Sequence, residues 1–282
     1  MKNFQPVIKW SGSKRSQANE IISFFPKEIN TYFEPFLGGG SILRTLLENK
    51  DIITVNKCHC SDINNDLIKL WNKIAFTPLM LSDEYLGRHN ELKRMENIAE
   101  KRSYYEDIRS RFNKEKDPFD FFFLLRTCYN GLVRYNRNGD FNSPFHLNRN
   151  GMDAERMSKI IFDWSNVINE NTVSFQCHSY EDIKPEENDF VYLDPPYANT
   201  NSSMYNGGFD NNSFFEWLRE LKCGWILSYD GKSGNDDNTF NVPKDLYDEH
   251  LYIKSGNSSF KRIKKSDTNA VVYESLYIKR NV

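Results

Sequence analysis

The sequence predicts an α/β protein built on an open, doubly wound and mostly parallel sheet. Short apolar or aromatic stretches with strand character alternate along the chain with helical stretches such as residues 213–221. The predicted strands comprise residues 32–36, 54–60, 173–178, 190–193, 224–229, 251–253 and 270–278. Sheets of this kind bind ligands outside the carboxyl ends of their strands, so we expect the functional residues in the turns that follow the strands.

The composition is that of a globular protein without an extreme charge. The chain has 282 residues, 39% of them hydrophobic, which is enough for one large or two modest domains. Its 37 basic and 39 acidic residues give a net charge of −2, so any affinity for nucleic acid must come from a local patch. The Phe-rich run at residues 119–125 is too short to span a bilayer, and the five cysteines lack the spacing of a disulfide framework. We expect a monomeric, cytoplasmic protein with reduced thiols and no membrane contact.

The first predicted turn follows the aromatic strand at residues 32–36 and contains Gly38, Gly39 and Gly40. Glycines between a strand and a helix allow close backbone approach and direct helix N–H groups at a nucleotide-like ligand. Asp62 follows about twenty residues later, at the end of the next strand, where a carboxylate reaches ribose hydroxyls. The chain has no phosphate-binding Gly-x-x-x-x-Gly-Lys-Ser/Thr sequence, and its glycine spacing does not fit the dinucleotide fingerprint. S-adenosylmethionine therefore fits this turn better than ATP or NAD.

A long insertion separates this turn from the later strands. Residues 84–111 have the pattern of a helix with one apolar face, and residues 119–125 have the composition of a core segment. Residues 126–156 contain five arginines, no lysine and three acids, interleaved with Asn, Tyr and Gly. Arginine reads guanine edges and grips phosphates, asparagine pairs with adenine edges, and Tyr or Leu can fill the gap left by an extruded base. This composition indicates double-stranded DNA as the partner, and the basic run at residues 261–265 suits further phosphate contact.

The strand at residues 190–193 ends in Asp194, Pro195, Pro196 and Tyr197, which are the predicted catalytic residues. Proline has a fixed φ and no N–H, so this turn is stiff and leaves carbonyl oxygens without local donors. The Asp194 carboxylate and the Pro195 carbonyl can both accept hydrogen bonds from one exocyclic NH2, while Tyr197 stacks on the heterocycle. Two such acceptors localise the nitrogen lone pair, which makes a poorly nucleophilic ring amine able to attack a methyl group.

These motifs, together with residues 9–14 (Lys-Trp-Ser-Gly-Ser-Lys), resemble the Dam family of DNA adenine-N6 methyltransferases. The order is that of the alpha group, in which the cofactor motifs precede the target domain and the catalytic motif follows it. The resemblance covers nearly the whole chain and implies a class I, Rossmann-like fold with seven strands and a reversed last hairpin. It implies a discontinuous catalytic domain of residues 1–76 and 159–282 and an inserted, mainly helical target-recognition domain of residues 77–158.

The resemblance also implies which residues bind S-adenosylmethionine, which leaves as S-adenosylhomocysteine. They are Trp10, Lys14, Glu34, Phe36, Gly38, Gly39, Gly40, Ser41, Asp62, Ser179, Tyr180 and Asp194. The predicted DNA contacts are Lys9, Tyr129, Asn130, Leu132, Arg134, Asn136, Arg137, Asn142 and Pro144. From His146 onward the chain departs from the Pro-Phe-Gly-Arg-Tyr-Lys sequence typical of relatives that read GATC, which puts GATC specificity in doubt while leaving DNA binding intact.

The predicted reaction is the transfer of a methyl group from S-adenosylmethionine to N6 of an adenine flipped out of double-stranded DNA, at GATC or a related short site. An RNA adenine methyltransferase, a DNA N4-cytosine methyltransferase and a catalytically silent DNA-binding relative are the alternatives. We expect no metal, because Cys58-His59-Cys60 alternates between the two faces of a strand and no second Cys/His pair follows it. The gene would be bacterial or phage-borne, and a cognate restriction endonuclease is left open as a partner.

Overall fold

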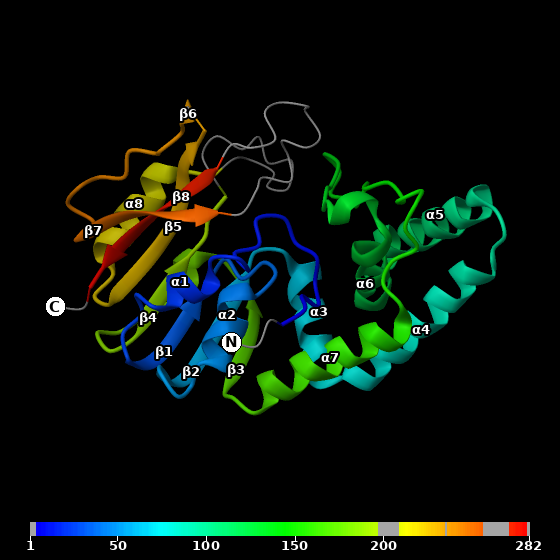
Figure 1. Ribbon diagram of the computed structural model, residues 1–282, viewed down its shortest axis with the longest axis horizontal. Coiled ribbons are helices and arrows are strands. Elements are labelled where there is room, and N and C mark those ends of the chain that lie inside the picture. Colours follow the sequence, from blue (N-terminus) through cyan, green and yellow to red (C-terminus); the bar gives the residue numbers. More distant parts are fainter. Residues whose placement is uncertain (1–3, 197–208, 235, 256–270, 281–282) are drawn as a thin grey trace. The chain divides into compact units, whose positions relative to one another are not determined.

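The computed structural model describes residues 4–196, 209–234, 236–255 and 271–280 (Figure 1). The chain divides into two compact units. The first comprises Met1–Ser13, Gly38–Gly40 and Asp62–Cys177, and the second comprises Lys14–Leu37, Ser41–Ser61 and His178–Val282. This division reflects packing, and the functional boundaries expected at residues 77 and 158 stay a prediction.

A mixed β-sheet is the framework of the second unit. Its strands are β1 (Glu28–Glu34), β2 (Thr54–Asp62), β4 (Phe190–Leu193), β5 (Gly224–Ser233), β6 (Asp236–Asp237), β7 (Glu249–Ser255) and β8 (Val272–Lys279). The strand order is β2-β1-β4-β5-β8-β7, and β6 pairs with the end of β5. Strands β2, β1, β4 and β5 are parallel, whereas β8 lies antiparallel between β5 and β7. The predicted α/β class with a parallel sheet centre is confirmed, and so is the reversed last hairpin.

Strand β4 is buried along its whole length, which explains its uninterrupted apolar sequence. All four of its residues are buried, as expected for a central strand that is covered on both faces. The one polar group among them, the Tyr192 hydroxyl, shares a hydrogen bond of 2.7 Å with Ser228 Oγ. Helices α1 (Ala18–Ile22), α2 (Ser41–Glu48) and α8 (Asn211–Glu220) belong to the same unit, and Phe214 of α8 lies in one hydrophobic cluster with Val191 and Leu193.

Helices make up most of the first unit. They are α3 (Asn65–Phe76), α4 (Pro78–Arg94), α5 (Ile98–Glu115), α6 (Pro118–Thr127) and α7 (Ala154–Asn169), joined by the 3-10 turn η1 (Tyr129–Gly131) and strand β3 (Val173–Cys177). The side chains of Asn64, Asn97, Asp117 and Asp153 accept backbone N–H bonds at the starts of α3, α5, α6 and α7. These caps determine where the four helices begin. With β3, the described residues contain eight strands, one more than the seven that the resemblance implies, the additional one being the two-residue β6.

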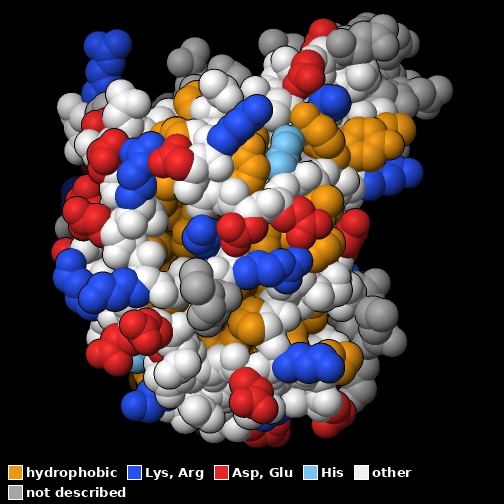
Figure 2. Space-filling view, turned by 90° about the vertical axis from the view of Figure 1, so that its left-hand side faces the viewer, with side chains coloured by type: hydrophobic (Ala, Val, Ile, Leu, Met, Phe, Trp, Pro, Cys, Tyr) orange, Lys and Arg blue, Asp and Glu red, His pale blue; other side chains and the backbone are white. Residues whose placement is uncertain are grey.

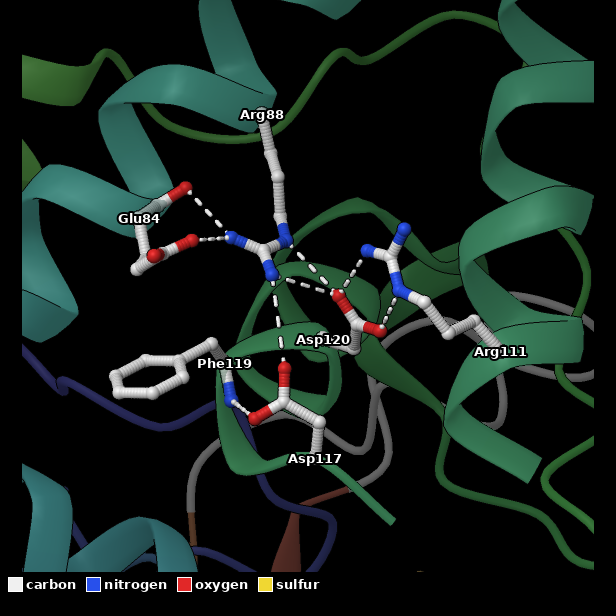
Figure 3. Close-up of polar contacts among 6 residues, drawn as sticks. All are labelled: Glu84, Arg88, Arg111, Asp117, Phe119 and Asp120. Atoms are coloured by element: carbon white, nitrogen blue, oxygen red, sulfur yellow. Dashed lines mark hydrogen bonds and ion pairs between the residues drawn. The ribbon is translucent and has the colours of Figure 1, made fainter. Parts of the chain in front are cut away.

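Helix α6 is the predicted Phe-rich core segment, and it contains a buried carboxylate. Asp120 is inaccessible to solvent, and its oxygens accept hydrogen bonds from Arg111 Nε at 2.7 Å and Arg111 Nη2 at 2.6 Å (Figure 3). Arg88 Nε donates to the same carboxylate at 2.9 Å, and Arg88 also contacts Glu84 and Asp117. Because Arg88 lies on α4 and Arg111 on α5, this network joins all three helices around one charge.

The surface has charges of both signs. On the face drawn in Figure 2, Lys and Arg side chains are interspersed with Asp and Glu side chains, in keeping with the small net charge. None of the described helices is long and apolar enough to cross a membrane. Within the described part of the chain, no group of three or more His, Cys, Asp or Glu residues is arranged to hold a metal ion.

Candidate active site and nucleic-acid surface

The catalytic candidate Asp194 follows β4 directly and forms an ion pair with Lys14. Lys14 Nζ lies 2.8 Å from Asp194 Oδ1 and 3.4 Å from Glu274 Oε2. The Lys14 side chain is only 4% exposed, whereas that of Asp194 is 19% exposed. Pro195 is buried and Pro196 half-buried, so the turn is packed as well as stiff. Asp194 is therefore held on one side by a buried cation while part of its surface faces solvent.

The pKa of Lys14 reflects two opposing effects. Burial alone would lower the pKa, but the carboxylates of Asp194 and Glu274 outweigh burial and raise it above its ordinary value. Lys14 therefore stays protonated at any physiological pH. A buried ammonium needs such partners, because an unpaired charge in this position would be strongly destabilising.

Glu34, at the end of β1, is a second acid of this corner. It is buried, and Tyr32 Oη donates a hydrogen bond of 2.8 Å to its Oε2 atom. Burial, which the Tyr32 hydrogen bond opposes and the nearby charge of Asp194 reinforces, raises the pKa of Glu34 to about 8. Glu34 is therefore mainly protonated at neutral pH. The remaining charges are one ammonium, on Lys14, and two carboxylates, on Asp194 and Glu274, so the corner is negative overall.

Phe36 and Tyr180 belong to an aromatic cluster in the second unit. Their rings stack with centroids 5.7 Å apart, and the ring of Phe214 meets that of Tyr180 edge-on at 5.1 Å. Ser179 caps the 3-10 turn η2 (Tyr180–Asp182), in which the side chains of Ser179 and Asp182 bond each other's backbone N–H groups. Contacts within the protein therefore already occupy part of the Tyr180 ring surface and the Ser179 hydroxyl, two groups that are predicted to bind the cofactor. Ser41 begins α2, and its carbonyl accepts a bond from Thr45 Oγ1 at 2.8 Å.

The first unit contains the other predicted cofactor residues, which are arranged around the glycine turn. Asp62 Oδ2 accepts a hydrogen bond from Gly38 N at 3.1 Å, and Asp62 Oδ1 accepts one from Asn64 N at 3.0 Å. Burial raises the pKa of Asp62 to about 6, although these two backbone bonds oppose the shift. The carboxylate is thus desolvated and bonded by only neutral donors, so additional hydroxyl donors would stabilise its charged form.

The glycines of this turn pack against indole rings. Gly38 has a φ of +47°, and a Cβ there would lie 2.9 Å from Trp10 Cδ1. Gly40 has a φ of +65°, and a Cβ there would lie 2.8 Å from Trp71 Cζ2. The Trp71 ring nitrogen also donates to Gly38 O at 3.0 Å. Backbone conformation and packing therefore require glycine at both positions, whether or not a ligand also approaches the turn.

The predicted DNA contacts surround the loop of residues 128–149 in the first unit. Buried and exposed residues alternate in its second half, where Phe141, Ser143 and Phe145 are buried and Asn142 and Pro144 are exposed. The exposed predicted contacts are Tyr129, Asn130, Arg134, Arg137, Asn142 and Pro144, and the half-buried ones are Lys9, Leu132 and Asn136. The buried side chains therefore anchor the loop in the first unit, and its exposed side chains form an Arg- and Asn-rich surface.

Hydrogen bonds within the loop fix its shape. Ser143 Oγ accepts from Arg134 N at 3.1 Å and donates to Leu132 O. Asn136 Oδ1 accepts from the backbone N–H groups of Asn138 and Asp140, both at 2.9 Å. The side chain of Asn136 is thus committed to a turn in this structure, whereas no such local role is seen for the Arg134 guanidinium among the described contacts.

Lys9 and Tyr129 belong to the same surface. A Cβ on Gly131 would lie 3.0 Å from Lys9 Cβ, so the Lys9 stem packs on this glycine. Burial and the charges of Arg126 and Arg149 lower the pKa of Lys9, which indicates a locally positive environment. The Tyr129 ring is exposed and stacks on His146 with centroids 5.4 Å apart. Tyr197 and the basic run at residues 261–265 lie outside the described residues.

Comparison with known proteins identifies the family of this chain. Residues 10–229 match the family described as D12 class N6 adenine-specific DNA methyltransferase. The chain belongs to this family. It is 33% identical over 217 residues to the Type II methyltransferase M.MjaIII of Methanocaldococcus jannaschii, with 71% of each chain covered. It is 34% identical over 225 residues to the DNA adenine methylase of Escherichia coli K12, covering 76% of this chain and 72% of the relative. For the Type II methyltransferase M1.LlaDCHI of Lactococcus lactis subsp. cremoris, the identity is 30% over 205 residues, covering 69% and 66%.

In this D12 class family member, Glu274, Trp71 and His146 are examples of residues that contact predicted site residues without being predicted site residues themselves. Glu274 reaches Lys14 from β8, and no sequence motif marks it. Trp71 fills the space beside Gly40, and its apolar position in a helical pattern indicates only a core residue. His146 stacks on Tyr129, and its departure from the sequence typical of GATC-reading relatives is the signal that marks it.

Proposed function

We propose that this protein transfers a methyl group from S-adenosylmethionine to N6 of an adenine that has been flipped out of double-stranded DNA. The observation that carries the proposal is the Asp194 corner, where a carboxylate on a stiff proline turn is ion-paired with the buried Lys14. Membership of the adenine-specific methyltransferase family supports adenine as the target base. The recognition sequence is GATC or a related short site.

S-adenosylmethionine, when bound, supplies a methyl group on a positively charged sulfonium, which is an activated donor. The partly exposed Asp194 carboxylate suits a cation of this kind. In the first unit, the desolvated Asp62 carboxylate suits ribose hydroxyls and would repel a phosphate. The proposed cofactor contacts are Trp10, Gly38, Gly39, Gly40 and Asp62 of the first unit and Lys14, Glu34, Phe36, Ser41, Ser179, Tyr180 and Asp194 of the second.

The chain's own groups then prepare the amine. The Asp194 carboxylate and the Pro195 carbonyl accept the two N6 hydrogen bonds, which localises the nitrogen lone pair. Pro196 has a fixed φ, which keeps the turn around the Pro195 carbonyl rigid. Tyr197 stacks on the extruded base. Lys14 fixes the Asp194 carboxylate through its 2.8 Å ion pair, so the acceptor needs no reorganisation when the base arrives.

The loop of residues 128–149 is the proposed DNA-reading surface. Its exposed Arg134, Arg137 and Asn142 provide the donors that pair with base edges and phosphates, and the exposed Tyr129 ring suits insertion beside an extruded base. Lys9, Asn130, Leu132, Asn136 and Pro144 complete the proposed set. Because arginine and lysine supply much of this surface, affinity for DNA should fall steeply with salt concentration.

The test of the proposed function is Asp194→Asn, which keeps the shape of the side chain but removes its charge. With radiolabelled cofactor and duplex DNA, we expect DNA binding to persist and methyl transfer to fall by about 10²–10³-fold. Asp245→Asn, at an exposed carboxylate paired with Arg219, is the matched control and should leave transfer unchanged. Transfer by Asp194→Asn at more than a third of the wild-type rate would refute the assigned role.

Product analysis separates the alternatives. Digestion of methylated DNA and RNA distinguishes N6-methyladenine from N4-methylcytosine and DNA from RNA as the substrate, while cofactor binding without turnover would identify a silent relative. Mapping the modified adenines after expression in a methylation-free host gives the recognition site. The relatives M.MjaIII and M1.LlaDCHI are both named Type II methyltransferases, which favours a restriction-modification setting with a cognate endonuclease. We propose that the protein acts as a monomer in the cytoplasm, encoded by a bacterium or a phage.

A further inference from the structure

Glu274 is connected to the Asp194 corner by a chain of polar contacts within the second unit. Ser255 Oγ, at the end of β7, donates a hydrogen bond of 3.2 Å to Glu274 Oε1 on β8. Glu274 Oε2 lies 3.4 Å from Lys14 Nζ, and Lys14 Nζ lies 2.8 Å from Asp194 Oδ1. The Glu274 side chain is only 15% exposed, so this contact is not a screened surface pair.

The unequal distances indicate how the ammonium is shared. Lys14 is closer to Asp194 than to Glu274, and its ammonium lies within ion-pair distance of both carboxylates. If Glu274 lost its charge, its negative potential would no longer offset the positive potential that Lys14 creates at Asp194. A carboxylate that is fully neutralised by an ammonium accepts further hydrogen bonds more weakly, because acceptor strength follows negative charge.

We propose that Glu274 is a positioning residue for methyl transfer, which shares the Lys14 ammonium so that Asp194 is held in place but only partly neutralised. Asp194 then remains a strong acceptor for the adenine amine. This inference rests on the proposed function and adds to it a residue of the last hairpin, which contributes no side chain to the predicted catalytic motif. Glu274 acts through Lys14 and Asp194 and need not touch either substrate.

The register of the hairpin explains why β8 can supply this residue. Glu274 pairs with Ile253 of β7, and Ser255 lies two residues farther along the same strand, on the same face as Ile253. Ser255 is thus within reach of Glu274 diagonally across the strand pair, and its hydroxyl fixes one carboxylate oxygen while Lys14 contacts the other. A carboxylate that accepts a hydrogen bond at one oxygen and forms an ion pair at the other has little freedom to rotate.

The first test is Glu274→Gln, which keeps the shape and the capacity to accept a bond from Ser255 but removes the charge. We expect kcat to fall at least about tenfold, while KM for DNA and for the cofactor changes less than about threefold. Cofactor affinity, measured by calorimetry without DNA, should likewise change little. Glu249→Gln, at an exposed carboxylate of β7 that pairs with Arg280 at 2.9 Å, is the matched control and should leave kcat unchanged.

A double-mutant cycle with Lys14→Met tests whether Glu274 acts through Lys14. In the Lys14→Met background, Glu274→Gln should cause no further fall in kcat, because the shared ammonium is gone. In ligand-free protein, urea unfolding of the same four variants should show coupling between the two positions, a readout that requires neither DNA nor cofactor. The same two comparisons separate a positioning role from a purely structural one, which would change unfolding alone.

The outcomes are distinct. Any one of three results would overturn the role of Glu274: a kcat of Glu274→Gln within twofold of wild type, a change in KM without a change in kcat, or an equal fall in kcat in the Lys14→Met background. If the wild-type protein still labelled DNA, the proposed function would stand in each of these cases. No labelled product from the wild-type protein would overturn both. Selective loss of kcat together with coupling in unfolding supports the inference.

Discussion

Removal of the charge from Asp120 tests how the helical unit is held together. In Asp120→Asn, the carboxamide keeps the shape of the side chain, but its NH2 group faces the N–H donors of Arg88 and Arg111. Two guanidinium groups would lose the carboxylate that joins α4, α5 and α6, as Figure 3 illustrates. We therefore expect a loss of stability that is large for a single isosteric change.

The magnitude follows from the exposure of the two arginines. Breaking a buried ion pair by removing one partner costs about 3–5 kcal/mol. Arg111 is 47% exposed, so water can hydrate its freed guanidinium, and Arg88 retains Glu84 and Asp117. The cost should therefore lie just below that range, at about 2–3 kcal/mol in the free energy of unfolding.

Urea unfolding followed by far-UV circular dichroism measures this cost. The control is Glu84→Gln, which removes an exposed i,i+4 partner of Arg88 and should cost about 0.3–0.5 kcal/mol. If Asp120→Asn lost no more than Glu84→Gln, the network in α6 would contribute nothing beyond an ordinary surface pair, and the reasoning from burial would be refuted.

Two further predictions concern the proposed site. Because burial raises the pKa of Glu34 from its ordinary 4.5 to about 8, the fold favours the protonated form, so its stabilising contribution is complete below pH 4.5 and is lost as the pH rises through about 8. Glu34→Gln should therefore gain stability relative to wild type between about pH 5 and pH 9 in urea unfolding, and a constant difference between the two proteins would contradict this. Arg134→Ala should relax sequence preference more than it weakens nonspecific binding, as measured by titration of cognate and scrambled duplexes. A uniform loss of affinity would make Arg134 a phosphate contact instead.

The strands were predictable because their apolar runs are local signals, but the start of β1 was not. The prediction begins at Tyr32, whereas the strand begins at Glu28. The polar Asn30 and Thr31 interrupt the apolar pattern, and Asp189 accepts bonds from Asn30 Nδ2 at 3.0 Å and Thr31 N at 2.9 Å. A partner so distant in sequence leaves no local pattern from which a strand could be predicted.

A candidate site could be proposed from the sequence where one motif contains the chemistry, but contacts that depend on packing could not. Residue types and spacing were enough to single out Asp194 and Asp62. The contact of Glu274 with Lys14 depends on the pairing of β8, which no short sequence encodes. Likewise, the position of Tyr180 next to the cofactor stays a prediction, but its burial against Phe36 and Phe214 depends on how two distant segments meet.

The glycine turn gives the protein an internal optical probe. The indole rings of Trp10 and Trp71 occupy the volume that side chains at Gly38 and Gly40 would otherwise fill, and the Trp71 ring nitrogen is bonded to the turn itself. Indole emission responds to hydrogen bonding and to nearby dipoles. A rearrangement of this turn by a few tenths of an ångström would therefore alter the fluorescence of the unlabelled protein, so that loading of the turn can be followed in real time without attaching a dye.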